Sequence, residues 1–431
     1  MPRETVSVRV QGWDVRDESV LTRRNTAFTT EWPVDSLLQS AAIEPPAGGW
    51  IAPVSSRLGM AHERHHAVAR GLSQLMLRAR SDDQGLLVGG GTAIESWATR
   101  AADLMGVPHV TLIAANAKPA IRTSARSREL SLEAPCGQAD IDHWIVQNCP
   151  RIEAMHVRPK GKLHSALQSR LSTQPDGVRV TTDQTLIEPP VKMELMEAGA
   201  VLIHRQCTAT STVASDEHVK LALDKSQRVD WQEVVAEHRW LTHCTRSRSG
   251  PWPGQSWEGY QDDLLAGDPE QASRSALDAL ARIVRMRRIV GSAITTDKRF
   301  PVVCFSEVPV AELIQRRSYR SHLKRWDYEP YAILVSIDAA KRHGLKPVIY
   351  GVDPLTLRIA TGEEYLFQAE GANDRWREER EWRWSGDLDL ACFRNDEVIV
   401  AVPNTQDAVR IANRPGFPWR VAVVAEGRSN D

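Results

Sequence analysis

Residues 85–105 read GLLVGGGTAIESWATRAADLM, an apolar run that ends in three glycines and leads into a stretch with helical spacing. A short apolar run closed by glycine predicts a buried strand, and the spacing from about residue 92 to residue 105 predicts a helix. Glycines at such a turn let the backbone approach a phosphate, and the N–H groups at the start of the helix attract anions. The stretch therefore predicts a parallel α/β domain with a phosphate-binding turn.

The neighbouring sequence repeats this alternation of strand and helix. Residues 50–56 (WIAPVSS) and 107–115 (VPHVTLIAA) are expected to form strands, and residues 62–80 a helix. Strands that alternate with helices imply right-handed crossovers and a mainly parallel sheet. We therefore predict a Rossmann-like domain over residues 1–205.

The second half of the chain follows a different pattern. Residues 206–238 begin with a polar, Ser/Thr-rich stretch and are interpreted as a connector. From residue 239 to residue 431, short strands dominate around one amphipathic helix at 273–290, for which Ser275 and Asp278 form a capping box and Gly291 is placed as the C-terminal residue. This half predicts a mixed α+β domain, so the fold class is α/β plus α+β.

Composition restricts the classes of function. The formal net charge is −1 and the isoelectric point is near 6.9, so no global basic field attracts nucleic acid. The six cysteines include no C-x-x-C pair, which argues against a disulfide framework or a zinc site. No apolar run approaches the roughly 20 residues that span a bilayer. We therefore expect a soluble cytoplasmic protein with no metal and no membrane partner.

The glycine-rich turn resembles the SLOG superfamily, a Rossmann-like group that includes the LOG-type nucleotide phosphoribohydrolases. The run Gly90-Gly91-Thr92-x-x-Glu95 is similar to the G-G-x-G-T-x-x-E signature of that group, and Ser56-Arg57 to its G-S-R turn. The chain departs from the signature by one residue in spacing and by Ser55 where a glycine stands. The resemblance spans about residues 45–205 and implies nucleotide binding, with these candidate residues: Ser56, Arg57, Gly89, Gly90, Gly91, Thr92 and Glu95.

Two of these residues have expected roles of their own. Thr92 is placed to cap the helix and to bind a phosphate oxygen, and Glu95 to hold a ribose hydroxyl or activate a water molecule. A glycine-rich turn also serves as a simple tight connection between strand and helix, and this structural alternative stays open. His62, His65 and His66 form a further cluster, in which His62 and His66 share a helix face at i, i+4 as a possible metal pair. No third metal ligand is evident, so a histidine cluster without metal is favoured.

Three short motifs mark the second half. Residues 241–245 read LTHCT, residues 302–309 read VVCFSEVP, and residues 376–384 read WREEREWRW with a period of two. That period places Arg377, Glu379, Glu381 and Arg383 on one face of a strand. Charges of this kind usually form a solvated, salt-bridged strand. If Glu381 instead faces His243, its carboxylate could bond a ribose hydroxyl and stabilise an oxocarbenium-like centre.

This second arrangement resembles the ADP-ribosyltransferase superfamily, in which an H-x-T strand, an aromatic-Ser strand and a later glutamate form the site. The resemblance implies His243, Thr245, Ser306 and Glu381 as catalytic residues, with an aromatic face from Phe305 or a nearby tyrosine. Residues 328–351, followed by residues 379–383, also look like abortive-infection proteins of the AbiGi type.

Together these patterns predict a prokaryotic antiviral defence protein in which a nucleotide-sensing domain controls an effector that cleaves NAD or transfers ADP-ribose. No tightly held cofactor is expected, and NAD or a related nucleotide is the expected ligand or substrate. One alternative is a non-enzymatic module whose second domain binds a protein or nucleic acid through Arg282, Arg285, Arg287 and Arg288. Another is a LOG-like hydrolase that acts through Glu95. The sequence leaves the oligomeric state open.

Overall fold

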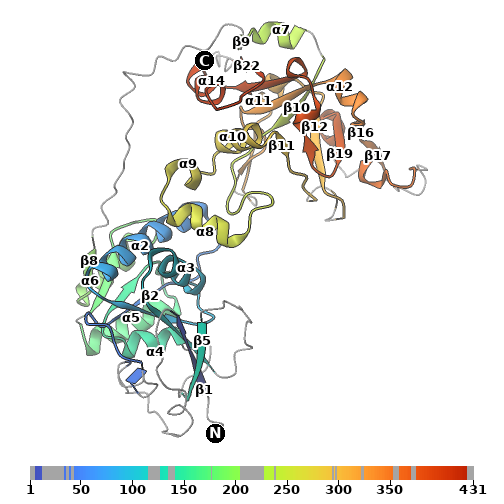
Figure 1. Ribbon diagram of the computed structural model, residues 1–431. Coiled ribbons are helices and arrows are strands. Elements are labelled where there is room, and N and C mark those ends of the chain that lie inside the picture. The colour runs from blue at the N-terminus through green and yellow to red at the C-terminus, as the bar shows by residue number, and fades with distance from the viewer. Residues whose placement is uncertain are drawn as a thin grey trace. The chain divides into compact units, whose positions relative to one another are not determined.

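The computed structural model divides the chain into two units, which are described separately (Figure 1). The first unit comprises Met1–Thr210 and Ser256–Ala272, and the second comprises Ser211–Gln255 and Ser273–Asp431. The structure describes residues 5–11, 34, 38–39, 43–114, 127–133, 141–175, 177–203, 228–236, 239–293, 296, 299–321, 325–352, 359–369 and 375–424.

A parallel sheet forms the centre of the first unit. Its strand order is β5-β1-β4-β3-β2-β6-β7-β8, and the run from β4 to β8 is parallel throughout. The parallel strands are β4 (His109–Ala114), β3 (Gly85–Gly89), β2 (Trp50–Val54), β6 (Ile152–Ala154), β7 (Val178–Thr181) and β8 (Val201–Ile203). The predicted Rossmann-like sheet is confirmed. Two antiparallel strands that the sequence analysis did not predict extend its β4 edge, β1 (Thr5–Gln11) and β5 (Ser127–Glu133).

Helices cover both faces of this sheet. Helices α2 (His62–Ser81) and α3 (Glu95–Met105) lie on one face, and α4 (Ile141–Asn148) and α5 (Lys162–Thr173) on the other (Figure 1). The next helix is α6 (Pro189–Glu197). Helix α3 ends at Gly106, whose φ of 67° is the left-handed conformation that glycine adopts without strain. The predicted helices at 62–80 and 92–105 are therefore present.

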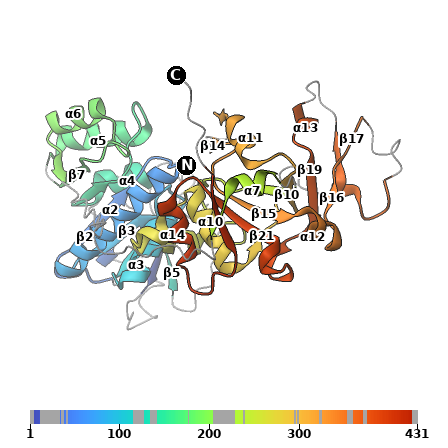
Figure 2. The ribbon, with the colours of Figure 1, turned by 90° about the horizontal axis from the view of Figure 1, so that it is seen from above.

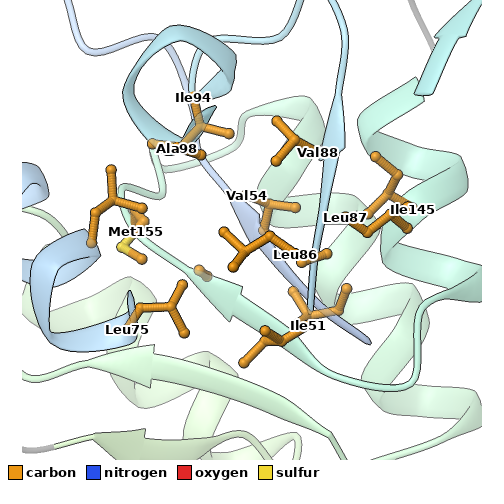
Figure 3. Close-up of a cluster of buried hydrophobic side chains, with 14 of the residues drawn as sticks. Ile51, Val54, Leu75, Leu86, Leu87, Val88, Ile94, Ala98, Ile145 and Met155 are labelled. Carbon is orange, nitrogen blue, oxygen red and sulfur yellow. The ribbon is translucent and has the colours of Figure 1, made fainter. Parts of the chain in front are cut away.

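The core of the first unit explains why residues 85–89 are apolar without alternation. Leu86, Leu87 and Val88 are all completely buried. Leu87 faces Ile145 of α4, while Ala98 of α3 lies on the opposite side of the sheet (Figure 3). A strand covered on both faces must be apolar at every position, as the sequence pattern indicated.

A mixed sheet forms the centre of the second unit, in the order β16-β19-β12-β10-β15-β21-β22-β9. Pairing is antiparallel from β16 to β21 and parallel from β21 to β9. The strands are β16 (Lys346–Pro347), β19 (Glu381–Ser385), β12 (Val302–Ser306), β10 (Trp240–Cys244), β15 (Ala332–Ser336), β21 (Val398–Val402), β22 (Arg420–Val423) and β9 (Arg228–Val229). The predicted mixed α+β fold is confirmed.

Helices also cover both faces of the mixed sheet. The larger apolar cluster joins one face to α10 (Ala276–Met286) and α14 (Thr405–Ala412), which lie together in Figure 2. The other face packs against α7 (Trp231–Ala236) and α11 (Val310–Gln315). The predicted capping box of Ser275 and Asp278 is present at the start of α10. The predicted end is wrong, because Arg287, with φ 48°, takes the left-handed position expected for Gly291.

The predicted period-two strand at residues 376–384 is only half correct. Residues Arg375–Glu378 form α13, and the strand begins at Glu381. Arg380 adopts a left-handed φ of 45°, which ends the helix before the strand begins. Within the described residues, no helix is long and apolar enough to cross a membrane.

Candidate functional site

The first unit has a point at which its sheet topology reverses. The chain runs from β2 through β3 to β4 on one side, and from β6 through β7 to β8 on the other. The connection after β2 therefore leads to one side of the sheet, and the connection after its parallel neighbour β6 leads to the other side. Ligands of such sheets bind outside the carboxyl ends of the strands at this position. The loops that meet there are residues 55–61, which the sequence analysis selected, and residues 155–161, which it did not.

The two loops are joined by hydrogen bonds. The Ser56 N–H donates to the His156 carbonyl at 2.7 Å, and the Arg158 N–H donates to Ser56 Oγ at 3.2 Å. Ser56 is half-buried at this junction, while the side chain of Arg57 is exposed. The candidate residue Ser56 therefore joins the loops, and Arg57 is the group from this loop that is free to meet a ligand.

The start of α5 attracts anions to this end of the sheet, where the loops after β2 and β6 meet. The N-cap of this helix is Gly161, which has no side chain to accept from the first N–H groups, and no acidic residue lies in the first turn. His164 Nδ1 accepts from the Lys160 N–H, just before the helix, at 3.3 Å. The first N–H groups of a helix carry partial positive charge and attract anions. The side chains of Arg158, Lys160 and Lys162 are exposed on either side of the Gly161 N-cap. Phosphate is the kind of group that this combination of charge and backbone donors binds.

His156 adds a buried acceptor to the same loop. Its side chain is 7% exposed, and its Nδ1 donates to the Leu186 carbonyl. Burial lowers the pKa of this imidazole, and the nearby Arg64 and Arg158 lower it further against the opposing Leu186 hydrogen bond. The ring is thus neutral at pH 7, with Nε2 as an acceptor. This atom has no hydrogen-bond partner within the described part of the chain.

The glycine-rich turn after β3 satisfies its own polar groups. Gly91 has a φ of 72°, and its N–H donates to Glu95 Oε2 at 2.7 Å. The Thr92 hydroxyl donates to the Gly89 carbonyl at 2.7 Å. A carboxylate thus already occupies a donor that a phosphate was expected to use. Thr92 and Glu95 therefore make the contacts expected of a tight connection between strand and helix, rather than of a phosphate site.

Packing explains the first two glycines of this turn. A Cβ at Gly89 would lie 2.6 Å from Ile141 Cγ2, and one at Gly90 would lie 3.0 Å from the Leu112 carbonyl oxygen. At either position, any side chain larger than the glycine hydrogen would displace a neighbouring group. Asp142, the residue after Ile141, is a further group near this turn, and burial raises the pKa of its carboxyl to about 6. No motif in the sequence marks this residue.

The four residues predicted to form a catalytic site in the second unit do not share one face. Thr242 pairs with Ser306, and Ser306 pairs with Glu381. Directly paired residues of antiparallel strands point to the same face, and successive residues alternate. His243 follows Thr242, so it points away from Ser306 and Glu381. Its ring lies 5.5 Å from that of Phe305, on the opposite face. The expected joint action of His243 and Glu381 on one ribose is therefore not supported.

Three of the four candidates make contacts that stabilise the fold. His243 Nδ1 donates to the Cys304 carbonyl at 2.8 Å, and burial lowers the pKa of the ring to about 4. Thr245 Oγ1 donates to the Ala276 carbonyl at 2.8 Å, which holds the start of α10. Ser306 Oγ donates to the backbone carbonyl of Glu379 at 2.5 Å. Each of these side chains is used within the unit.

Glu381, the fourth candidate, is bound by Arg383. Its two oxygens accept from Arg383 Nε at 2.9 Å and from the terminal guanidinium nitrogen at 3.2 Å. Arg383 is completely buried, whereas the Glu381 side chain is 13% exposed. The salt-bridged alternative from the sequence is thus present, but the cation of the pair is buried rather than solvated.

Glu379 is the carboxylate that the sequence analysis passed over. It accepts a hydrogen bond from the Tyr328 hydroxyl at 2.5 Å. Burial raises the pKa of Glu379, and Glu381 raises it further, although the bond from Tyr328 opposes both. Burial also raises the pKa of Tyr328. The period of two had placed Glu379 beside Glu381, but the sequence gave no sign of the tyrosine contact.

Three of the four arginines proposed to bind a protein or nucleic acid have partners within the second unit. Arg282 lies over the ring of Trp252, and Arg287 donates to the Gly416 carbonyl at 2.8 Å. Arg288 forms an ion pair with Asp387. These contacts weaken the case for a free basic surface formed by these arginines.

No protein-family model, no curated protein and no solved structure matches the chain. The fold and the site therefore define its class: a Rossmann-like α/β unit with a basic edge at its topological switch point, together with a mixed-sheet α+β unit. Among the described residues, no group of three or more His, Cys, Asp or Glu side chains is placed to hold a metal ion.

Proposed function

We propose that the first unit binds a phosphate-bearing nucleotide between the loops that follow β2 and β6. The observation that carries this proposal is the uncapped start of α5 at the switch point, with Arg158 and Lys160 exposed beside it. Arg57, on the adjoining loop, supplies a further cation. The expected phosphate position thus moves from the glycine-rich turn to α5, since Glu95 already occupies the Gly91 N–H.

Two features favour a nucleotide over inorganic phosphate. The buried Nε2 of His156 is an acceptor for a hydroxyl or amino group, and a nucleotide carries such groups on its ribose and base in addition to its phosphate. The turn after β3 lies at the same edge, because β3 is the parallel neighbour of β2. The loops that follow β3, β2 and β6 therefore lie side by side, a width that suits an extended ligand.

A panel of ligands tests this proposal. We expect AMP, ATP, ADP-ribose and NAD to differ in potency but adenosine to fail, because the phosphate supplies the main attraction. A ligand present at 100 times its dissociation constant stabilises the folded state by about 2.7 kcal/mol, which thermal unfolding detects. The stabilisation is expected to weaken as salt is added. Equal stabilisation by adenosine and AMP, or none by any compound, would contradict the proposal.

A second proposal assigns chemistry on NAD to the face of the second unit that carries Glu379 and Glu381. The supporting observation is the different environment of two nearby carboxylates, one bound to a buried guanidinium and the other to a phenol. Carboxylates in contrasting environments serve as separate acid, base or charge-stabilising groups. In this proposal Glu379, rather than His243, acts together with Glu381. If ADP-ribose is transferred, the acceptor is a protein. The non-enzymatic module is the alternative.

NAD consumption by the full chain tests this second proposal. Glu379→Gln keeps the shape but removes the charge, so we expect turnover to fall at least about 100-fold, as for loss of a charge-stabilising group. Asp338→Asn, at an exposed carboxylate of the same unit, is the matched control and should leave turnover unchanged. Wild-type turnover that Glu379→Gln does not reduce would contradict the proposed site, and absence of turnover with every nucleotide present would favour the module.

A further inference from the structure

A segment from the middle of the second unit's sequence packs within the first unit. Residues Ser256–Ala272 belong to the first unit, although the residues on both sides belong to the second. The segment forms α8 (Trp257–Leu265) and α9 (Pro269–Ala272). Helix α8 contacts α2 and α3, the two helices that follow β2 and β3 (Figure 1). It therefore touches both helices that lead away from the predicted ligand loops.

The contacts of α8 with α3 are specific. Asp262 accepts two hydrogen bonds from Arg100, at 2.6 and 2.7 Å. Gln261 donates to Ser96 Oγ at 3.2 Å, one residue after the start of α3. Two parallel bonds between guanidinium and carboxylate fix orientation as well as distance. Helix α8 is thus held in a defined position against the first turns of α3.

Tyr260 of α8 connects to the β2 loop through His65 and also contacts His62. His65 Nε2 lies 2.8 Å from the Gly59 carbonyl, and His65 Nδ1 lies 3.1 Å from the Tyr260 hydroxyl. A carbonyl only accepts, so Nε2 must carry the proton. Burial lowers the pKa of His65, and in the neutral ring Nδ1 then accepts from Tyr260. The tyrosine oxygen accepts in turn from His62 Nδ1, at 3.0 Å. Every member of this chain has a consistent donor or acceptor role.

The residues at the end of this chain hold the ligand loop. Gly59 has a left-handed φ of 67°, and the preceding Leu58 carbonyl accepts from Arg64 at 2.6 Å. Arg57 and Ser56 stand directly before these two anchored residues. Tyr260 is completely buried, and its ring contacts those of His65, Trp97 and Trp257. His65 therefore contacts α8 through Tyr260 and the ligand loop through Gly59.

We propose that Tyr260 is a positioning residue for the ligand loop, so that docking of α8 and binding of the nucleotide stabilise each other. This inference rests on the proposed nucleotide site. Coupling between two sites is reciprocal: if α8 tightens the loop for the ligand, the ligand must tighten α8 by the same factor. Since the chain continues from both ends of this segment into the second unit, α8 links occupancy of the ligand loop to the segments beside Gln255 and Ser273.

Tyr260→Phe in the full chain tests the proposal, because it removes the hydroxyl and keeps the ring. Hydrogen exchange of the unliganded protein should be faster at residues 57–61 in this variant. AMP should bind about 10-fold more weakly, which corresponds to about 1.4 kcal/mol. AMP should also slow exchange at residues 257–265 in the wild type and do so less in the variant. Ser172→Ala is the control, since it removes a hydroxyl bond to the Ser169 carbonyl within α5, outside both α8 and the ligand loop. It should change neither measurement.

The outcomes separate the two proposals. If no nucleotide binds the wild type, the proposed function is wrong, and exchange at residues 57–61 still tests the role of Tyr260. If AMP binds and Tyr260→Phe matches Ser172→Ala in both exchange and affinity, the positioning role is wrong. If Tyr260→Phe does not fold, Asp262→Asn weakens the docking of α8 without touching the histidines. It should weaken AMP binding in the same direction, and unchanged affinity would overturn the coupling.

Discussion

Arg383→Met is expected to lower the free energy of unfolding of the second unit by about 3–5 kcal/mol, the range for breaking a buried ion pair. The guanidinium is completely buried and is bonded to Glu381. It also donates to the Tyr365 and Phe367 carbonyls, each at 3.0 Å, and to Gln368 Oε1 at 2.6 Å. Methionine fills much of the space but leaves a carboxylate and three further acceptors without their donor.

Chemical denaturation monitored in the second unit measures this loss. Arg239→Met is the matched control, because the pair of Arg239 with Asp338 spans 3.9 Å between side chains that are about 70% exposed. An exposed pair of this kind contributes at most about 1 kcal/mol. Similar small losses in both variants would show that the Arg383 cluster does not stabilise the unit. Taken from the sequence alone, the Glu381–Arg383 pair would have been assigned the smaller value, since the pattern cannot reveal burial of the guanidinium.

The first unit was predictable where local pattern determines structure. A short, unbroken apolar run such as residues 85–89, followed by glycines that mark a turn, predicts a strand covered on both faces. The position of the proposed ligand site depends instead on which strands are neighbours in the sheet. The sequence does not state that β6 lies beside β2, so the cations at Arg158 and Lys160 were overlooked. The run RPKGK at residues 158–162, between a strand and a helix, was a signal that could have identified them.

In the second unit, the sequence motifs did not predict which face of the sheet each candidate residue occupies. The strands that carry His243, Ser306 and Glu381 are indeed neighbours, but one residue of register decides which face a side chain occupies. The motif specifies the residue types and their order, but not the register of the strands. Because Thr242 pairs with Ser306, His243 lies on the other face. The insertion at residues 256–272 was missed for a related reason. Its helical spacing predicts an apolar face but not the unit against which that face packs.

The affinity of Lys160→Glu for the tightest-binding nucleotide tests the central claim most directly. The substitution reverses a charge beside the uncapped start of α5, and a carboxylate there is compatible with the helix dipole, so the fold should be retained. Arg80→Glu is the control, because it reverses an exposed charge in the last turn of α2, at the opposite edge of the sheet. Calorimetric titration should show a loss of about 100-fold for Lys160→Glu, or about 2.7 kcal/mol, and little change for Arg80→Glu. Unchanged affinity in Lys160→Glu, or equal losses in both variants, would contradict a phosphate site at the switch point between β2 and β6.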